Sequence, residues 1–254
     1  MKNLIPGNTL FAEGQMVPLL VLCICVITFI IATWLTRRRR LRPISGMVLL
    51  RSLLSQAIEA RGRIHLALGS GQIGGHSTIE TMAGLTLLDY LAKQSVLCDI
   101  PLTVSVADPT TLAAAQGILR RSVEQSEHSD SLPSASVHFI APDPIAYASG
   151  AAHLIERENP ALDVLIGTYG PEYMLIGEAG ARRDVSQVAG TTSPEALALM
   201  YPTADETLVG EEIFALGSYL DCPAHLGSLM TEDVLRIITA GLILIGVVFY
   251  SLRF

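Results

Sequence analysis

Short apolar runs alternate with segments of helical periodicity between residues 61 and 210 of this 254-residue chain. The runs that read as strands are 63–68, 102–107, 136–141, 163–168, 186–191 and, more weakly, 206–210. The segments that read as helices are 78–94, 110–125, 144–157, 171–181 and 194–200. Continuously apolar strands that alternate with helices are typical of a parallel sheet covered on both faces. We therefore predict one Rossmann-like, doubly wound α/β domain with a mainly parallel sheet.

The starts of these helices carry a recurring signal. A proline directly follows each of four small or acidic residues, namely Asp108, Asp143, Gly170 and Ser193. Proline is well tolerated in the first turn of a helix, where its missing N–H is not needed, and acids or serine suit the position before it. The four sites therefore predict where four of the helices begin.

Residues 44–60 form a separate amphipathic segment upstream of the first strand. Its apolar positions recur at helical spacing, at Met47, Leu50, Leu54 and Ile58. This pattern predicts a connecting helix that either lies along a membrane or packs onto the domain. Farther on, residues 122–136 read as a single low-complexity loop.

Two uncharged apolar segments flank this region. Residues 17–35 carry no charge over 19 positions, about the length that crosses a bilayer core as a helix. A positive cluster follows, which we expect at the cytoplasmic membrane interface: Arg37, Arg38, Arg39, Arg40 and Arg42. Residues 237–252 are shorter and read as a second span or as a buried C-terminal helix, and their lack of charge favours the span.

The order of charge and apolar sequence predicts the topology. Because the arginines follow the first apolar run instead of preceding it, the pattern argues against a cleavable signal peptide. We expect an N-terminal anchor in residues 1–43, a cytoplasmic domain with its leading helix in 44–233, and a C-terminal transmembrane helix in 234–254. Both termini then lie outside.

The charge of the central region limits its partners. Residues 44–233 hold 9 lysines and arginines against 23 aspartates and glutamates, a net charge of −14. Such an acidic domain repels phosphate backbones, so we expect no nucleic-acid partner. The four cysteines, at positions 23, 25, 98 and 222, form no disulfide or zinc pattern.

The stretch "GSGQIGG" at 69–75 is the main candidate for ligand binding. Gly69, Gly71 and Gly74 have the G-x-G-x-x-G spacing, and the stretch follows a strand and precedes a helix. A cofactor would be held by Gly69, Ser70, Gly71, Gly74, Gly75 and, at the end of the next strand, Asp108. Backbone N–H groups there suit a phosphate. However, Asp108 lies 34 residues beyond Gly74, where about 20 is usual, and the turn has no nearby lysine or arginine.

Three interpretations of the turn stay open: a dinucleotide or mononucleotide site, a site for another anion, or glycines required only by a tight turn and close helix packing.

The sequence evidence for catalytic residues is weaker than the evidence for a binding site. His76 follows the turn, whereas His65 and His138 lie within strands and read as buried and hydrogen-bonded. Adjacent Glu211 and Glu212 point apart, so a joint acid–base role is not expected. No nucleophile motif or metal set is present, so we predict no catalytic or metal-binding residues.

The motifs "GRIHLALGSGQIGG", "VADPTTLAAAQGILRR" and "LIGTYGPEYMLIGEAGARR" resemble an uncharacterised family of bacterial membrane-anchored proteins, a domain of unknown function. The similarity covers most of residues 61–235. It implies a protein of the bacterial plasma membrane with a cytoplasmic domain, and it transfers no catalytic role to any residue.

Together these observations predict a non-enzymatic scaffold or assembly subunit of a membrane complex. The alternative is a nucleotide- or dinucleotide-binding sensor or enzyme that uses the glycine turn. We also expect association with a second copy or a sister subunit, through the lipid-embedded spans and the 44–60 helix more than through the acidic strand ends. Small residues in the spans allow close helix approach: Ala32, Thr33, Ala240, Gly241 and Gly246.

Overall fold

A computed structural model describes residues 44–125 and 135–220. The predicted spans at 17–35 and 237–252 and the arginine cluster at 37–42 lie outside these residues. Within the two described ranges, no helix has both the length and the apolar character that crossing a bilayer requires.

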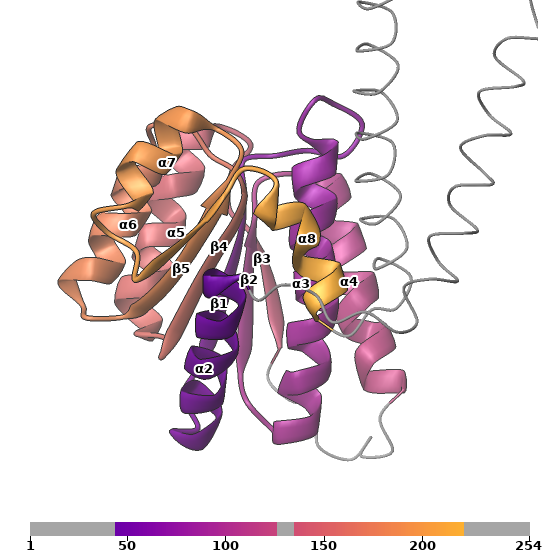
Figure 1. The fold of residues 1–254 in the computed structure, drawn as a ribbon. Coiled ribbons are helices and arrows are strands. Elements are labelled where there is room, and N and C mark those ends of the chain that lie inside the picture. The colour runs from indigo at the N-terminus through magenta and orange to yellow at the C-terminus, as the bar shows by residue number, and fades with distance from the viewer. Residues whose placement is uncertain (1–43, 126–134, 221–254) are drawn as a thin grey trace, which may run out of the picture. The chain divides into compact units, whose positions relative to one another are not determined.

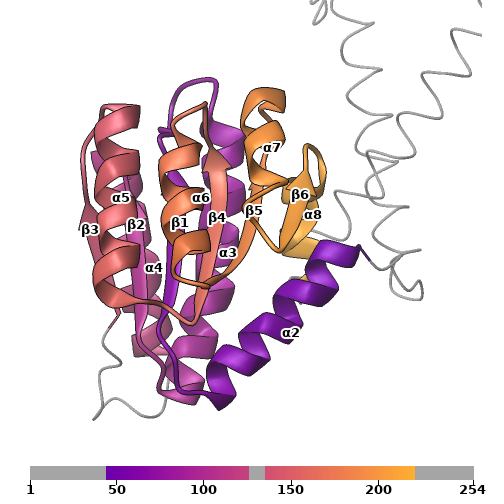
Figure 2. The same cartoon turned by 90° about the vertical axis from the view of Figure 1, so that its left-hand side faces the viewer.

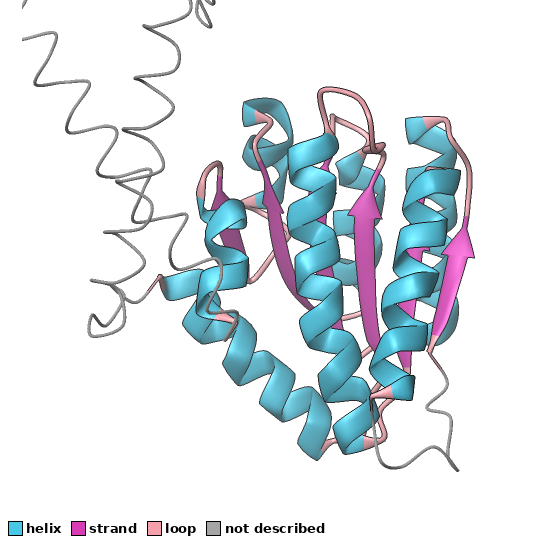
Figure 3. Ribbon diagram, turned by 90° about the vertical axis from the view of Figure 1, so that its right-hand side faces the viewer, coloured by secondary structure: helices cyan, strands magenta, loops and turns pink. Residues whose placement is uncertain are grey.

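The centre of the domain is a six-stranded sheet whose strands all run parallel (Figure 3). The strands are β1 (Ile64–Gly69), β2 (Leu102–Val106), β3 (Ser136–Phe139), β4 (Leu162–Thr168), β5 (Ser186–Thr191) and β6 (Glu206–Val209). Their spatial order is β3-β2-β1-β4-β5-β6, which is the order of the Rossmann fold. The predicted α/β class and doubly wound sheet are confirmed, and the described sheet is wholly rather than mainly parallel.

Within the described residues, five helices connect successive strands, one helix precedes β1 and one follows β6. They are α2 (Ser45–Glu59), α3 (Thr78–Cys98), α4 (Pro109–Glu124), α5 (Pro144–Glu158), α6 (Tyr173–Arg182), α7 (Pro194–Met200) and α8 (Glu212–Tyr219). Asp108, Asp143 and Ser193 cap α4, α5 and α7 with their side chains, and a proline follows each cap, as the sequence predicts. After Gly170 the prediction is less accurate, because α6 begins at Tyr173. Helix α8 was not predicted.

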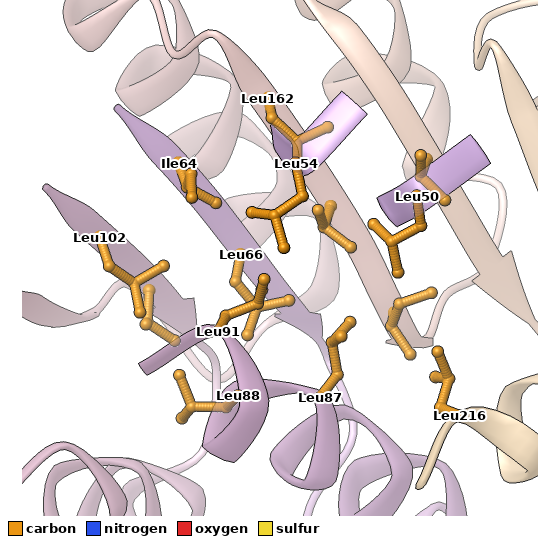
Figure 4. Packing of buried hydrophobic residues seen from close by; sticks show 14 of the residues in the cluster. Leu50, Leu54, Ile64, Leu66, Leu87, Leu88, Leu91, Leu102, Leu162 and Leu216 are labelled. Carbon is orange, nitrogen blue, oxygen red and sulfur yellow. The ribbon is translucent and has the colours of Figure 1, made fainter. Parts of the chain in front are cut away.

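The helices form two layers around the sheet (Figure 1). Helices α5, α6 and α7 cover one side, which we call the polar face because of the residues described below. Helices α3, α4 and α8 cover the other side, where α2 also packs. We call this second side the aliphatic face, because its buried cluster consists almost wholly of leucine, isoleucine, valine and alanine (Figure 4).

The connecting helix α2 packs onto the domain. It runs diagonally from beside β6 (Figure 2), and Met47, Leu50, Leu54 and Ala57 are buried in the core of the aliphatic face. These four side chains are therefore not available for the lateral association that the sequence predicts for this helix. The domain's own strands already cover this apolar stripe. This packing is favourable because it removes the apolar surface of the helix from water.

Candidate functional site

The glycine turn lies at the carboxyl end of a central strand, as predicted. β1 pairs with β2 on one side and β4 on the other, and the chain order reverses between β1 and β4. In doubly wound sheets ligands bind outside this switch point. Gly69 is the last residue of β1 and pairs with Thr168, the last residue of β4.

Two glycines are required at this turn for different reasons. Gly69 has a φ of +73°, and a Cβ there would lie 2.4 Å from the carbonyl oxygen of Thr168. Gly71 has no left-handed backbone, but a Cβ would lie 2.6 Å from Thr81 Oγ1 and 2.9 Å from Thr168 Oγ1. The turn therefore packs tightly against α3 and β4. Gly74 and Gly75, by contrast, are exposed, and of these two Gly74 has a positive φ, of +103°.

Several N–H groups of the turn already have partners within the chain. Ser70 N donates to the carbonyl oxygen of Thr168 at 3.0 Å. Gln72 N donates to Ser77 Oγ, and Gly74 N donates to Thr78 Oγ1, each at 2.9 Å. A phosphate at this turn would have to compete with these side chains for the donors it needs.

A carboxylate lies at the switch point itself. Glu80, in the first turn of α3, is buried and accepts a hydrogen bond from Thr168 Oγ1. An acid is stabilised near a helix N-terminus by the helix dipole, which is the position that a pyrophosphate takes in dinucleotide-binding folds. Glu80 places a carboxylate in this first turn, and its charge would repel a phosphate group bound beside it.

Asp108, the expected ribose partner, is used as a helix cap. Its Oδ2 accepts hydrogen bonds from Thr111 N at 2.9 Å and Thr111 Oγ1 at 3.1 Å, and another from Thr110 Oγ1. Partial burial acts to raise the pKa of Asp108, but these hydrogen bonds outweigh it and hold the pKa below its usual value. The structure shows no hydrogen bond between Asp108 and the glycine turn.

At the other helix starts along the carboxyl edge of the sheet, backbone N–H groups also donate to side-chain oxygen atoms of the chain. Asp143 Oδ1 accepts from Ala146 N, and Ser193 Oγ accepts from Ala196 N. Glu172 accepts from the N–H of Gly170 in the loop before α6, and Glu212 accepts from the N–H of Val209 at the end of β6. The chain's own oxygen atoms thus take anion-binding positions along this edge.

A buried polar network crosses the polar face of the sheet. His65 Nδ1 lies 2.7 Å from Asp163 Oδ1, and His65 Nε2 lies 3.0 Å from Ser105 Oγ. Gln187 Nε2 donates to Asp163 Oδ2 at 3.0 Å. His65, Asp163 and Gln187 come from β1, β4 and β5 at directly paired positions. The network therefore links four adjacent strands.

Tyr147 connects this network to the glycine turn. Its hydroxyl accepts a hydrogen bond from Gly69 N and lies within 3.2 Å of both the Oγ and the carbonyl oxygen of Ser105. Burial raises the pKa of Tyr147 to about 12. Burial also raises the pKa values of Tyr169 and Tyr173, whose rings pack edge to face against each other.

Ser105, His65 and Asp163 have the atom order of a hydrolytic triad. A nucleophile must reach its substrate, but Ser105 and Asp163 have no exposed surface and His65 is only 2 % exposed. Ser105 also lies within β2, beneath the Tyr147 hydroxyl. The network is therefore a structural element of the core.

The sequence predicted part of this arrangement. His65 is buried and hydrogen-bonded, as expected, and half-buried His138 contacts Ser136 Oγ. His76 is exposed in the loop before α3. Asp163 was not singled out, although a charged residue inside the apolar run "LDVLIGT" is a signal, since buried carboxylates are almost always paired.

Among the residues with described structure, no group of three or more histidine, cysteine, aspartate or glutamate side chains is arranged to hold a metal ion.

A family model described as "Domain of unknown function (DUF6754)" matches residues 9–254. The chain belongs to this family. The match includes the whole described domain and both flanking apolar segments. No curated protein and no solved structure matches the chain.

Proposed function

We propose that this DUF6754 protein is a membrane-anchored, non-enzymatic scaffold or assembly subunit of a membrane complex. The observation that carries the proposal is the closed switch point of the sheet. β1 and β4 pair up to Gly69 and Thr168, and the Glu80 carboxylate, in the first turn of α3, would repel an anionic group bound beside it. A Rossmann-like domain that repels an anion at its switch point lacks the usual location for nucleotide chemistry.

Exposed apolar side chains support a role in association. Ile145, in the first turn of α5, is 64 % exposed, and Met174 and Leu175, in the first turn of the neighbouring α6, are 39 % and 42 % exposed. We call these three residues the α5–α6 patch. Exposed apolar side chains that gather on one part of a surface are typical of protein contacts. This patch replaces the α2 stripe as the surface through which we propose that the domain meets a second copy or a sister subunit.

The anchoring part of the proposal rests on sequence. Residues 17–35 and 237–252 would span the plasma membrane of a bacterium, with residues 44–233 in the cytoplasm and both termini outside. Single cysteines placed at positions 5 and 254 should react with an impermeant reagent in intact cells, while one placed at position 127 should not. The reverse labelling would overturn this topology.

Native mass spectrometry of the full chain, released in mild detergent, tests the assembly role. We expect a mass above that of the monomer, and we expect the double variant Ile145→Ser/Leu175→Ser to lower the assembled fraction at least threefold. Leu97→Ser is the matched control, because Leu97 is 75 % exposed at the far end of α3. A monomeric mass for the unaltered chain, with no crosslinks in intact membranes, would overturn the proposal.

The alternative role, a nucleotide- or dinucleotide-binding sensor or enzyme, is favoured by the Rossmann strand order and the positive φ angles of Gly69 and Gly74. Calorimetric titration with ATP and with NAD tests it. Saturable binding that Gly71→Val abolishes and Gly75→Val preserves would favour the sensor over the scaffold. Absence of binding to either compound would leave the scaffold as the better account.

A further inference from the structure

β6 forms one of the two edges of the described sheet, and β3 forms the other. β6 pairs with β5 on one side, over Glu206 to Val209, and no described strand pairs with its other side. An edge strand presents N–H and C=O groups that can pair with another strand. In β6 the N–H of Val209 already donates to Glu212 Oε2, so an added strand would pair with the remaining edge groups or displace that carboxylate. Many sheet proteins blunt such an edge with lysine or proline, and the sequence of β6, "ETLV", contains neither.

A groove of about 290 Å³ runs along this edge. Its walls include Ser45 of α2, Tyr201 after α7, Val209 of β6 and three acids, namely Asp205, Glu206 and Glu212. No lysine or arginine is among its lining residues. The groove is therefore a concave, negatively charged surface beside a strand that can still form hydrogen bonds.

The three carboxylates are held in place by hydrogen bonds to the chain. Asp205 Oδ2 accepts from Gln187 N, Glu206 Oε1 accepts from Ser45 Oγ, and Glu212 Oε2 accepts from Val209 N, each at 2.9 Å. A carboxylate offers about four lone-pair positions, so each can accept further donors from a ligand. Fixed carboxylates lose little side-chain entropy when a cation binds.

Two apolar side chains add contact surface to the acidic groove. Tyr201 is 65 % exposed and Val209 is 42 % exposed. In an extended peptide, alternate side chains point to the same side. A strand laid beside β6 would thus present one set of side chains to the carboxylates and keep its backbone available to the edge.

We propose that the edge of β6 docks an extended, lysine- or arginine-containing segment of a partner protein by strand addition. The main-chain pairing supplies affinity, and the acids select for positive charge. An anionic lipid surface does not fit, because the carboxylates would repel it. The inference rests on the proposed scaffold role and names the chemistry of one partner. It uses a different surface from the α5–α6 patch, so the two can fail separately.

The test uses the full chain in uncharged detergent and a fluorescent ten-residue peptide of alternating lysine and threonine. We expect saturable binding by fluorescence anisotropy, together with slower hydrogen exchange at the amides of Glu206 to Val209. The all-D form of the peptide should bind at least tenfold more weakly, because it has the same charge but cannot form a regular pair with an L strand.

The charge requirement is tested with Glu206→Gln/Glu212→Gln, which keeps side-chain size and the acceptors for Ser45 and Val209. We expect peptide affinity to fall about threefold to tenfold, as for the loss of two partly exposed ion pairs. Glu59→Gln/Glu124→Gln is the matched control, since it removes the same charge from exposed sites on α2 and α4.

Equal binding of the D and L peptides, equal loss in the two double variants, or exchange protection outside β6 would each overturn the proposal. If these results occur while the native mass still shows an assembly, only the docking site fails and the scaffold role stands.

Discussion

The two faces of the sheet are built from the same strands but differ in chemistry. On the aliphatic face, β1 contributes Ile64, Leu66 and Leu68 to a continuous apolar cluster. On the polar face, the same strand contributes His65 to the hydrogen-bonded network and Ala67 to a cluster of alanines, tyrosines and larger aliphatic residues. Because side chains alternate along a strand, one sequence of six residues supplies both surfaces.

The difference shows how the two faces specify the fold. Apolar packing on the aliphatic face depends on volume and shape, and it tolerates many hydrophobic substitutions. The network on the polar face requires particular atoms at particular positions, since a one-residue slip of β4 would move Asp163 to the opposite face. We infer that the aliphatic face supplies much of the stability, and that the paired His65, Asp163 and Gln187 set the register of β1, β4 and β5.

The largest expected effect comes from breaking the polar network. Asp163→Ala leaves His65 and Gln187 without their shared partner in a buried site, so we expect a loss of about 3–5 kcal/mol in the free energy of unfolding. Urea denaturation at pH 7 measures it. The double variant His65→Leu/Asp163→Leu should recover at least half of the loss, because replacing both partners removes the unsatisfied groups.

The matched change on the aliphatic face is Leu66→Ala, next to His65 in β1. Its expected loss is about 2–5 kcal/mol from lost burial and the remaining cavity. A double variant that shows no recovery over Asp163→Ala would contradict the distinction that we draw between the faces.

A smaller loss of stability is expected from a substitution in the glycine turn. Gly71→Val would push a side chain into Thr81 and Thr168, so we expect a loss of about 1–3 kcal/mol in thermal or urea unfolding. Gly75→Val is the control, because a Cβ at Gly75 would have no neighbour closer than 3.8 Å. Equal stability of the two variants would show that Gly71 is not required for packing.

The smallest effect that we expect is a pH dependence of the free energy of unfolding, which arises from tyrosines on the polar face. Burial raises the pKa of Tyr147 to about 12, so the folded state holds this proton where the unfolded chain, with a pKa of about 10, releases it. The resulting stabilisation is complete below pH 10 and is lost as the pH rises toward 12. The pKa values of Tyr169 and Tyr173 are raised in the same direction, on the same face.

We therefore expect the urea midpoint to fall between pH 10 and pH 12. Tyr147→Phe should lose about 1–2 kcal/mol at pH 8, because Gly69 N loses its acceptor, and it should depend less on pH above 10. A variant that loses stability as steeply as the unaltered protein above pH 10 would exclude Tyr147 as a source of the pH dependence.

The sequence alone determined the order and type of most elements. The alternation of apolar runs predicted all six strands to within one or two residues, because period and composition are local properties. Proline after Asp108, Asp143 and Ser193 located three helix starts, because capping is also local. Helix α8 was missed, since the pattern gave no separate signal between 206–210 and the apolar segment that follows.

Only the tertiary structure decided what the glycine turn and the buried polar residues do. The G-x-G-x-x-G spacing allowed a phosphate site, but whether Glu80 lies against Thr168 depends on how α3 packs on β4, 88 positions along the chain. The contact between His65 and Asp163 joins residues 98 positions apart. Such contacts follow from strand order and register, which are set by the packing of the whole domain and leave no short-range pattern in the sequence.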